Sequence, residues 1–244
     1  MKIDSQEINS TLSFEDYKKL ILEDYQVIFT SRQTSILGRR EVLSGKGTFG
    51  IFGDGKELPQ IGLNRFFQAG DIRSGYYRDQ TIMIAQGHLD PEKLFAAIYA
   101  HPDIKNEPMS AGRQMVGHFS NTLVDENGIW LDQTQSKNHV SDVSSTGAQM
   151  PRLIGLAQAS KIYRSLKIKN AHKFSNNGDE IAWGTIGNAS TSEGLFFEAI
   201  NAAGVLQIPM VMSVWDDDYG ISVDNKQQTT KESISKALEG FARE

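Results

Sequence analysis

Two polar residues, Asn188 and Asp217, each follow a short apolar run and could together bind a hard divalent cation. An amide oxygen and a carboxylate are ligands that such an ion accepts. Between them, residues 190–192 are candidate helix N-caps, and Glu193 stands where a carboxylate suits the helix dipole. The N–H groups at that helix start could bind a phosphate. The pattern indicates a metal–diphosphate site, and a common turn capped by solvated aspartates has the same spacing and remains the alternative.

The elements that must position these residues are a strand, a helix and a second strand. Residues 180–186 are rich in β-forming side chains, residues 196–204 follow a helical period, and residues 210–215 form a second apolar run after Pro209. A βαβ unit brings the carboxyl ends of both strands to one edge of a parallel sheet, where ligands bind. The predicted fold class is α/β, with a mostly parallel central sheet flanked by helices.

Residues 187–222 resemble the thiamine diphosphate motif of the 2-oxoacid dehydrogenase E1 α subunits. Gly187-Asn188-Ala189 stands at the family's Gly-Asp-Gly, Ser192-Glu193-Gly194 matches unchanged, and residues 216–222 stand at Asn-Asn-x-Tyr-x-Ile-Ser. The family's acidic metal ligand is Asn188 here and its asparagine ligand is Asp217, so one carboxylate and one amide remain with their places exchanged. The family's arginine or similar residue before Asn-Asn is Trp215 here.

This resemblance implies a three-layer fold that binds thiamine diphosphate and Mg²⁺. The implied metal ligands are Asn188, Asp217 and the backbone carbonyl of Tyr219. The implied contacts to the cofactor from this turn are Gly187, Asn188, Ala189 and Ser190.

Residues 73–80 read Arg-Ser-Gly-Tyr-Tyr-Arg-Asp-Gln and resemble the family's Tyr-Arg-(Glu/Asp) motif after a short strand. The resemblance implies that Tyr77 and Arg78 reach the terminal phosphate of the cofactor, for which the planar fork of arginine is suited. The residues alone instead favour a pair between Arg78 and a carboxylate such as Asp79, with Tyr77 in the core.

Two further segments resemble the family. Residues 112–115, Gly-Arg-Gln-Met, followed by His118 and an aromatic residue, are similar to the branched-chain E1 α subunits. Histidine titrates near neutral pH, so His118 is a candidate catalytic residue, with a structural histidine as the alternative. Residues 143–151 resemble the family's Ser-Ser segment, which implies backbone contacts from Ser145 and Gly147 to the cofactor rings.

The remaining elements follow from periodicity and turn residues. Ser13 is a candidate N-cap of a long helix over about 14–38, and further helices are predicted at 59–67, from Pro91 to about 99, from Pro151, and at 231–242 after Thr229 and Thr230 as caps. Gly53-Asp54-Gly55 also matches Gly-Asp-Gly, but no β run precedes it, so a surface turn is predicted. Residues 120–142 are polar and are interpreted as an insertion, in which His139 is assigned no role.

Length and composition limit the class of protein. The 244 residues are enough for one large α/β domain, which we divide into an N-terminal arm and helix (1–40) and a thiamine diphosphate-binding domain (41–244) shorter than the family's at its C-terminal side. A net charge of −5 argues against nucleic acid or an anionic membrane as a partner. With no cysteine, no disulfide forms, and with no signal-like start or long apolar run the expected location is cytoplasmic.

For function, the resemblance implies oxidative decarboxylation of a 2-oxoacid, of the branched-chain kind, and transfer of the acyl group to a lipoyl group. The implied partners are an E1 β subunit or fused β half, which carries a glutamate that activates the cofactor, and a lipoyl-bearing E2 acyltransferase. The assembly is then an oligomer such as a heterotetramer, and the chain is expected to be inactive alone. The alternatives are a pyruvate or acetoin E1 α subunit and a non-catalytic assembly fragment of the same fold.

Overall fold

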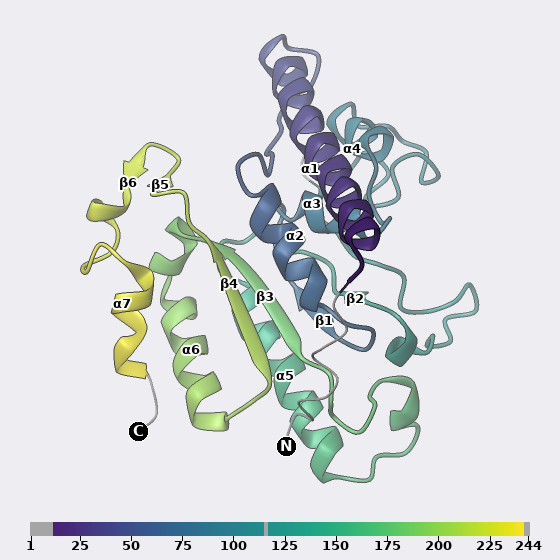
Figure 1. The fold of residues 1–244 in the computed structure, drawn as a ribbon, viewed down its shortest axis with the longest axis vertical. Coiled ribbons are helices and arrows are strands. Elements are labelled where there is room, and N and C mark those ends of the chain that lie inside the picture. The colour runs from purple at the N-terminus through teal and green to yellow at the C-terminus, as the bar shows by residue number, and fades with distance from the viewer. Residues whose placement is uncertain (1–11, 115–116, 242–244) are drawn as a thin grey trace.

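The computed structural model describes residues 12–114 and 117–241, and its centre is a parallel four-stranded sheet (Figure 1). The strand order is β2 (Asn138–His139), β1 (Ile72–Ser74), β3 (Ala182–Gly187) and β4 (Met210–Trp215). The predicted α/β class with a mostly parallel sheet is confirmed. β4 lies at the edge of this sheet, and its residues before Trp215 are only half-buried.

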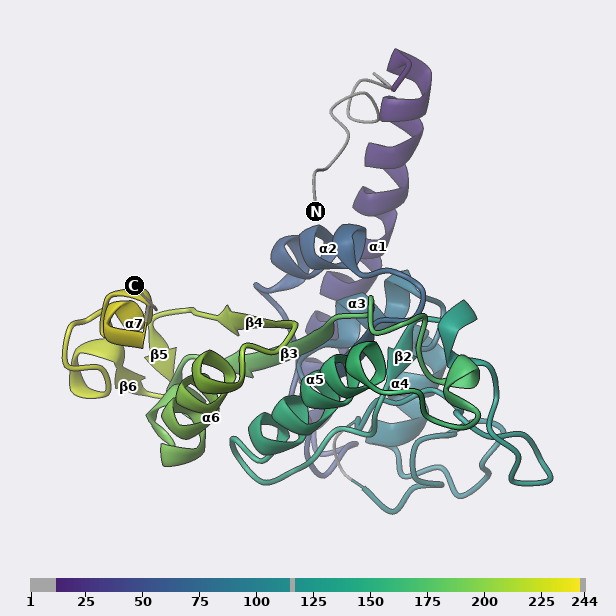
Figure 2. The ribbon, with the colours of Figure 1, turned by 90° about the horizontal axis from the view of Figure 1, so that it is seen from below.

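Helices cover both faces of the sheet. Figure 2 shows α5 and α6 on one side and α1 and α2 on the other, so the fold has three layers. The α-helices in the described ranges are α1 (Phe14–Leu43), α2 (Glu57–Phe66), α3 (Gln80–Ala85), α4 (Pro91–Ile98), α5 (Gln149–Ser165), α6 (Gly194–Leu206) and α7 (Ile234–Leu238). A small antiparallel pair, β5 (Tyr219–Gly220) and β6 (Val223–Asp224), follows β4. Across the part of the chain described, no helix combines the length and apolar character that crossing a membrane requires.

The strand β3 is buried on both faces, as a central strand of a parallel sheet should be. Ile186 packs with Met150 and Phe196 under α5 and α6. Trp183 faces the opposite layer, in a cluster with Phe67 and other apolar side chains. Side chains of β3 therefore pack into the hydrophobic layers on both faces of the sheet. The carboxyl end of the strand remains available to form the site.

The long N-terminal helix begins where the sequence predicts and ends later. The Ser13 side chain accepts a hydrogen bond from the Asp16 backbone N–H at 3.1 Å, which confirms it as the N-cap. The helix runs past Gly38 to Leu43, so the predicted end is wrong. A Cβ at position 38 would lie 2.4 Å from Phe52 Cε1, so this glycine allows close packing rather than ending the helix.

Two capping predictions are also wrong. Residues Ala189–Ser192 form a 3-10 turn, and α6 begins only at Gly194 with Glu193 in the N-cap position. The last helix begins at Ile234 after Ser233, whose side chain accepts from the backbone of the first turn, and a 3-10 turn then continues to Phe241. Position 242, the predicted last residue, lies outside the described residues. In both cases several hydroxyl residues precede the helix, and local sequence does not single out one of them.

The polar stretch 120–142, interpreted as an insertion, supplies the outer strand β2. The Asn138 side chain donates to the carbonyl oxygens of Asp71 at 3.1 Å and Gln133 at 2.8 Å, and His139 Nε2 lies 2.6 Å from Gln86 Oε1. Both buried residues are polar and hydrogen-bonded, although the His139 ring also packs against Phe67, so a search for apolar periodicity does not find them. His139, assigned no role, is part of the core.

Candidate functional site: a polar cavity at the sheet edge

A cavity of about 500 Å³ opens at the carboxyl ends of β3 and β4. Its volume lies in the range of about 300–1,000 Å³ that small-molecule sites occupy. Most residues that the sequence predicted for cofactor and metal contacts line it: Tyr77, Arg78, Gly187, Asn188, Ala189, Ser190, Asp217 and Tyr219. The fold thus brings together segments that lie far apart in the chain.

The pairing of β3 with β4 places the two proposed metal ligands at the same edge. Gly187 lies opposite Trp215 in the register, and the Asn188 N–H donates to the Trp215 carbonyl at 3.3 Å. The Asn188 side chain is buried and donates through Nδ2 to Asn225 Oδ1 at 3.2 Å. Because the amide nitrogen is used in this way, its oxygen is the atom left to meet a cation. Asn225 in turn donates to Asp216 Oδ1 at 3.2 Å, which ties the two loops together.

Asp217 is half-exposed, and its carboxylate already meets a cation from another part of the chain. Lys56 Nζ donates to Asp217 Oδ2 at 2.6 Å, and the lysine side chain is only 10% exposed. Lys56 follows the turn at Asp54 and Gly55, where the predicted turn is confirmed, and it lines the cavity. Sequence reasoning missed Lys56, because nothing near it in the chain points to a partner 161 positions away.

The Tyr-Tyr-Arg segment after β1 forms the opposite wall. The guanidinium of Arg78 lies 5.2 Å from the centre of the Tyr77 ring, and Nη1 approaches the Tyr77 hydroxyl at 3.4 Å. Among the described residues Arg78 forms no salt bridge, since Asp79 pairs with Arg73 instead. The alternative in which Arg78 is neutralised by a carboxylate is therefore wrong, and its charge faces the cavity.

Tyr76 was not singled out by the sequence, yet its side chain bears on the site. Its hydroxyl is buried and has no hydrogen-bond partner among the residues that the structure describes. A Cβ built on Gly187 would lie 3.5 Å from this oxygen, so the hydroxyl points at the turn after β3. Burial raises the pKa of Tyr76 well above its usual value, which keeps the hydroxyl protonated. It is therefore an unused donor beside the cavity.

A buried charge cluster under the cavity connects the strand ends. The Arg73 guanidinium is fully buried and donates through Nε to Asp79 Oδ2 at 2.8 Å and through Nη2 to Asp142 Oδ1 at 2.7 Å. Asp79 also accepts from the Trp215 indole at 2.9 Å and from the Thr185 hydroxyl. One carboxylate thus connects the ends of β1, β3 and β4, which fixes the floor of the site.

The pH dependence of stability offers a test of this cluster. Burial raises the pKa of Asp142 to about 6, against about 3.9 in an unfolded chain. The folded protein then holds this proton to higher pH, so the stability that the protonated group contributes is complete below about pH 4 and is lost as the pH rises through about 6. We expect the free energy of unfolding of the wild type, minus that of Asp142→Asn, to fall by about 1–3 kcal/mol over this range. Urea titrations at several pH values measure this difference in the free energy of unfolding. A difference that does not change with pH contradicts the prediction.

His118, Ser145 and Gly147 are not among the residues that line the cavity. His118 is buried, with Nε2 2.5 Å from Ser144 Oγ. Ser145 is exposed and Gly147 is buried with φ +78°, while Thr146 between them lines the cavity. The catalytic role of His118 stays a prediction. Residues 115–116 of the neighbouring motif lie outside the described residues.

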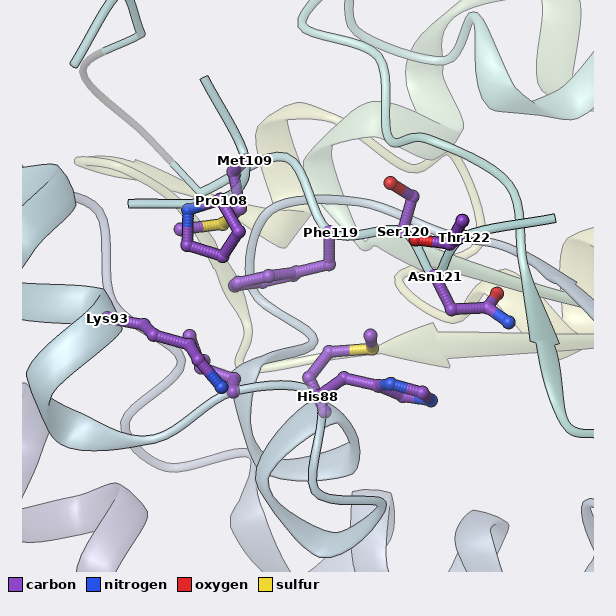
Figure 3. Close-up of a pocket in the computed structure, with 10 residues that line it drawn as sticks. His88, Lys93, Pro108, Met109, Phe119, Ser120, Asn121 and Thr122 are labelled. Atoms are coloured by element: carbon purple, nitrogen blue, oxygen red, sulfur yellow. The ribbon is translucent and has the colours of Figure 1, made fainter. Parts of the chain in front are cut away.

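A smaller hollow of about 200 Å³ lies next to the His118 segment (Figure 3). In the close-up, Lys93 and His88 lie on one side of Phe119, and Met109 and Pro108 lie on the other. Lys93 Nζ is 3.0 Å from Asp90 Oδ2, and burial lowers the pKa of His88. Because the Lys93 ammonium is already paired with a carboxylate, this hollow is less suited to a phosphate than the larger cavity, where Arg78 forms no salt bridge among the described residues.

Comparisons with known proteins show which family the chain resembles. A family model described as dehydrogenase E1 component matches residues 30–242. The 2-oxoisovalerate dehydrogenase subunit alpha of Bacillus subtilis (strain 168) is 29% identical over 203 residues, which is 81% of this chain and 51% of that protein. The mitochondrial pyruvate dehydrogenase E1 component subunit alpha of Dictyostelium discoideum is 25% identical over 176 residues, 72% of this chain and 38% of that protein. The chain thus spans about half the length, or less, of these curated relatives.

Proposed function

This chain belongs to the dehydrogenase E1 component family, and from this premise we propose that its cavity binds thiamine diphosphate with Mg²⁺ for the oxidative decarboxylation of a 2-oxoacid. The observation that carries the proposal is one cavity whose lining combines the turn after β3, the loop after β4 and the Tyr77-Arg78 pair. The two strand ends were predicted together on grounds of metal and phosphate chemistry, and the Tyr77-Arg78 pair was predicted from the family resemblance.

The residues present fit the cofactor. Diphosphate needs cations and N–H or O–H donors, and the cavity offers Arg78, Lys56 and the unpartnered hydroxyl of Tyr76. No group of three histidine or acidic side chains suited to a metal occurs in the described ranges. A Mg²⁺ ion here would therefore combine Asp217 with amide, carbonyl and phosphate oxygens, which is how this ion binds in phosphate sites.

In the proposed reaction the bound cofactor supplies the nucleophilic carbon and the electron sink, and the protein supplies binding and orientation. Asn188, Asp217 and the Tyr219 carbonyl bind the metal. Tyr77 and Arg78 hold the terminal phosphate through charge-assisted hydrogen bonds. We propose that His118, although outside the cavity lining, donates or accepts a proton near the substrate carboxylate and that Ser144, in contact with its Nε2, orients its ring.

We propose a branched-chain 2-oxoacid as substrate, because the Bacillus relative, named for 2-oxoisovalerate, aligns over a longer stretch at higher identity than the Dictyostelium one, named for pyruvate. The alternative is a pyruvate or acetoin E1 α subunit. Decarboxylation of both kinds of oxoacid, assayed with the partner subunit present, decides between them.

We also propose that a β subunit, or a fused β half, covers the cavity and that a lipoyl-bearing E2 takes the acyl group. Large side chains at the rim are exposed, since Ile221 is fully solvent-accessible and Tyr219 and Val223 are about half-exposed. An apolar rim beside a polar cavity is typical of a surface that another polypeptide covers.

The test is binding by the chain itself. Trp215 lines the cavity, so its fluorescence should report thiamine diphosphate, and we expect tight binding with Mg²⁺ and at least about tenfold weaker binding with EDTA, as for any metal-bridged phosphate. The chain alone should not decarboxylate a 2-oxoacid. Equal binding with and without metal contradicts the proposed site, and rapid turnover by the isolated chain contradicts the need for a partner. No binding even with the partner present would favour the assembly role instead.

A further inference from the structure

The salt bridge between Lys56 and Asp217 affects how the cavity binds a cation and an anion. Both residues line it, and the lysine side chain is nearly buried, with its Nζ on Asp217 Oδ2 at 2.6 Å. The other charged side chains lining the cavity are Arg78 and Glu193. With two cations and two anions, this lining carries no net charge before any ligand arrives.

Lys56 is held in place by its backbone. It is the residue before α2, its N–H donates to the Gly53 carbonyl at 3.1 Å, and its carbonyl accepts from Gln60 N–H. The side chain can therefore change its partner, but its stem stays within the cavity wall. A buried ammonium that loses its carboxylate needs another anion at once, because an unpaired buried charge is costly.

A divalent cation on either oxygen of the Asp217 carboxylate would lie close to the Lys56 ammonium. Two positive charges held by one carboxylate repel strongly in a partly buried site. If Asp217 takes a metal ion, Lys56 must turn away, and a diphosphate bound in the same cavity would give it a new anion. The same carboxylate thus serves as the partner of Lys56 in one state and of the metal in the other.

We propose that Lys56 is a further diphosphate-binding residue and that it competes with the divalent cation for Asp217 until the diphosphate arrives. This inference rests on the proposed function of the cavity. Metal and diphosphate should then bind cooperatively. The metal releases Lys56 from Asp217 so that it can bind the diphosphate, and the diphosphate pairs with the ammonium that would otherwise be buried without an anion.

The inference predicts opposite changes for one substitution. Lys56→Gln should bind Mn²⁺ alone about threefold or more tightly, since the competitor is gone, and should bind inorganic pyrophosphate without metal about tenfold or more weakly, since a charged donor is lost. Free Mn²⁺ measured by electron paramagnetic resonance and calorimetry with pyrophosphate give the two constants. Lys46→Gln is the matched control, because Lys46 is an exposed lysine paired with Glu41 and does not line the cavity.

A second variant tests the pair from its other side. Asp217→Asn should weaken Mn²⁺ binding but strengthen metal-free pyrophosphate binding, because Lys56 is released. This variant also decides the matter if thermal melting shows that Lys56→Gln does not fold. Changes no larger than those of Lys46→Gln, or pyrophosphate affinity unchanged in Asp217→Asn, overturn the inference alone. A wild-type chain that binds neither Mn²⁺ nor pyrophosphate nor thiamine diphosphate with Mg²⁺ overturns the proposed function with it.

Discussion

Replacing Arg73 by alanine is expected to lower the free energy of unfolding by about 3–5 kcal/mol, the cost of leaving buried carboxylates without their cation. The guanidinium is fully buried between Asp79 and Asp142, and it is hydrogen-bonded to both. Without it the two carboxylates face each other in a dry interior, and the hydrogen bonds from Trp215 and Thr185 to Asp79 do not neutralise them. Urea unfolding followed by far-UV circular dichroism measures the loss.

The control is Arg39→Ala. Arg39 pairs with Asp54 at 2.7 Å on the surface, where such pairs contribute about 0–1 kcal/mol. The free energy of unfolding of Arg73→Lys should lie between those of the two alanine variants. An ammonium keeps the positive charge but lacks the planar guanidinium that donates to both carboxylates at once. Equal stability of Arg73→Ala and Arg39→Ala would show that the cluster does not hold the strand ends together.

Replacing Arg78 by alanine is expected to weaken binding of thiamine diphosphate with Mg²⁺ by about 10- to 100-fold, the usual value of a charge-assisted hydrogen bond to phosphate. Arg78 lines the cavity, stacks on Tyr77 and forms no salt bridge within the described ranges, so its loss removes a ligand contact and little else. Titration of the Trp215 fluorescence gives the affinity, and urea unfolding should show a change below about 1 kcal/mol, as for other partly exposed positions.

Arg39→Ala again serves as the control for a lost arginine, with unchanged affinity expected. Arg78→Lys should recover part of the affinity through charge alone. Wild-type affinity in Arg78→Ala would mean that the segment after β1 does not meet the phosphate, and the cavity would have to bind the cofactor in another orientation.

The part of the site that the sequence predicts is the part built from adjacent segments. Apolar runs that end in Gly187-Asn188 and in the aspartates after Trp215 mark two strand ends, and a parallel sheet places such ends together. The family resemblance then added Tyr77 and Arg78, and the cavity includes both. Here local pattern and fold agree on which residues lie together, while their role in binding stays a prediction.

The residues that were missed owe their position to contacts far along the chain. Lys56 meets Asp217, Arg73 meets Asp142, and neither pair leaves a trace in periodicity or spacing. Tyr76 stands beside Tyr77 in the sequence, and only the fold shows that its hydroxyl is buried without a partner among the described residues. The outer strand β2 was missed for a related reason, because its buried residues, Asn138 and His139, are polar and hydrogen-bonded.

The edge strand β4 affects how this chain behaves at high concentration. Within the described residues β4 bonds only to β3, and its side chains are half-covered. A strand in this position offers its spare amide groups to any extended segment that comes near. Concentrated solutions are therefore expected to become turbid because intact molecules pair edge to edge at β4, and light scattering that rises with protein concentration measures it.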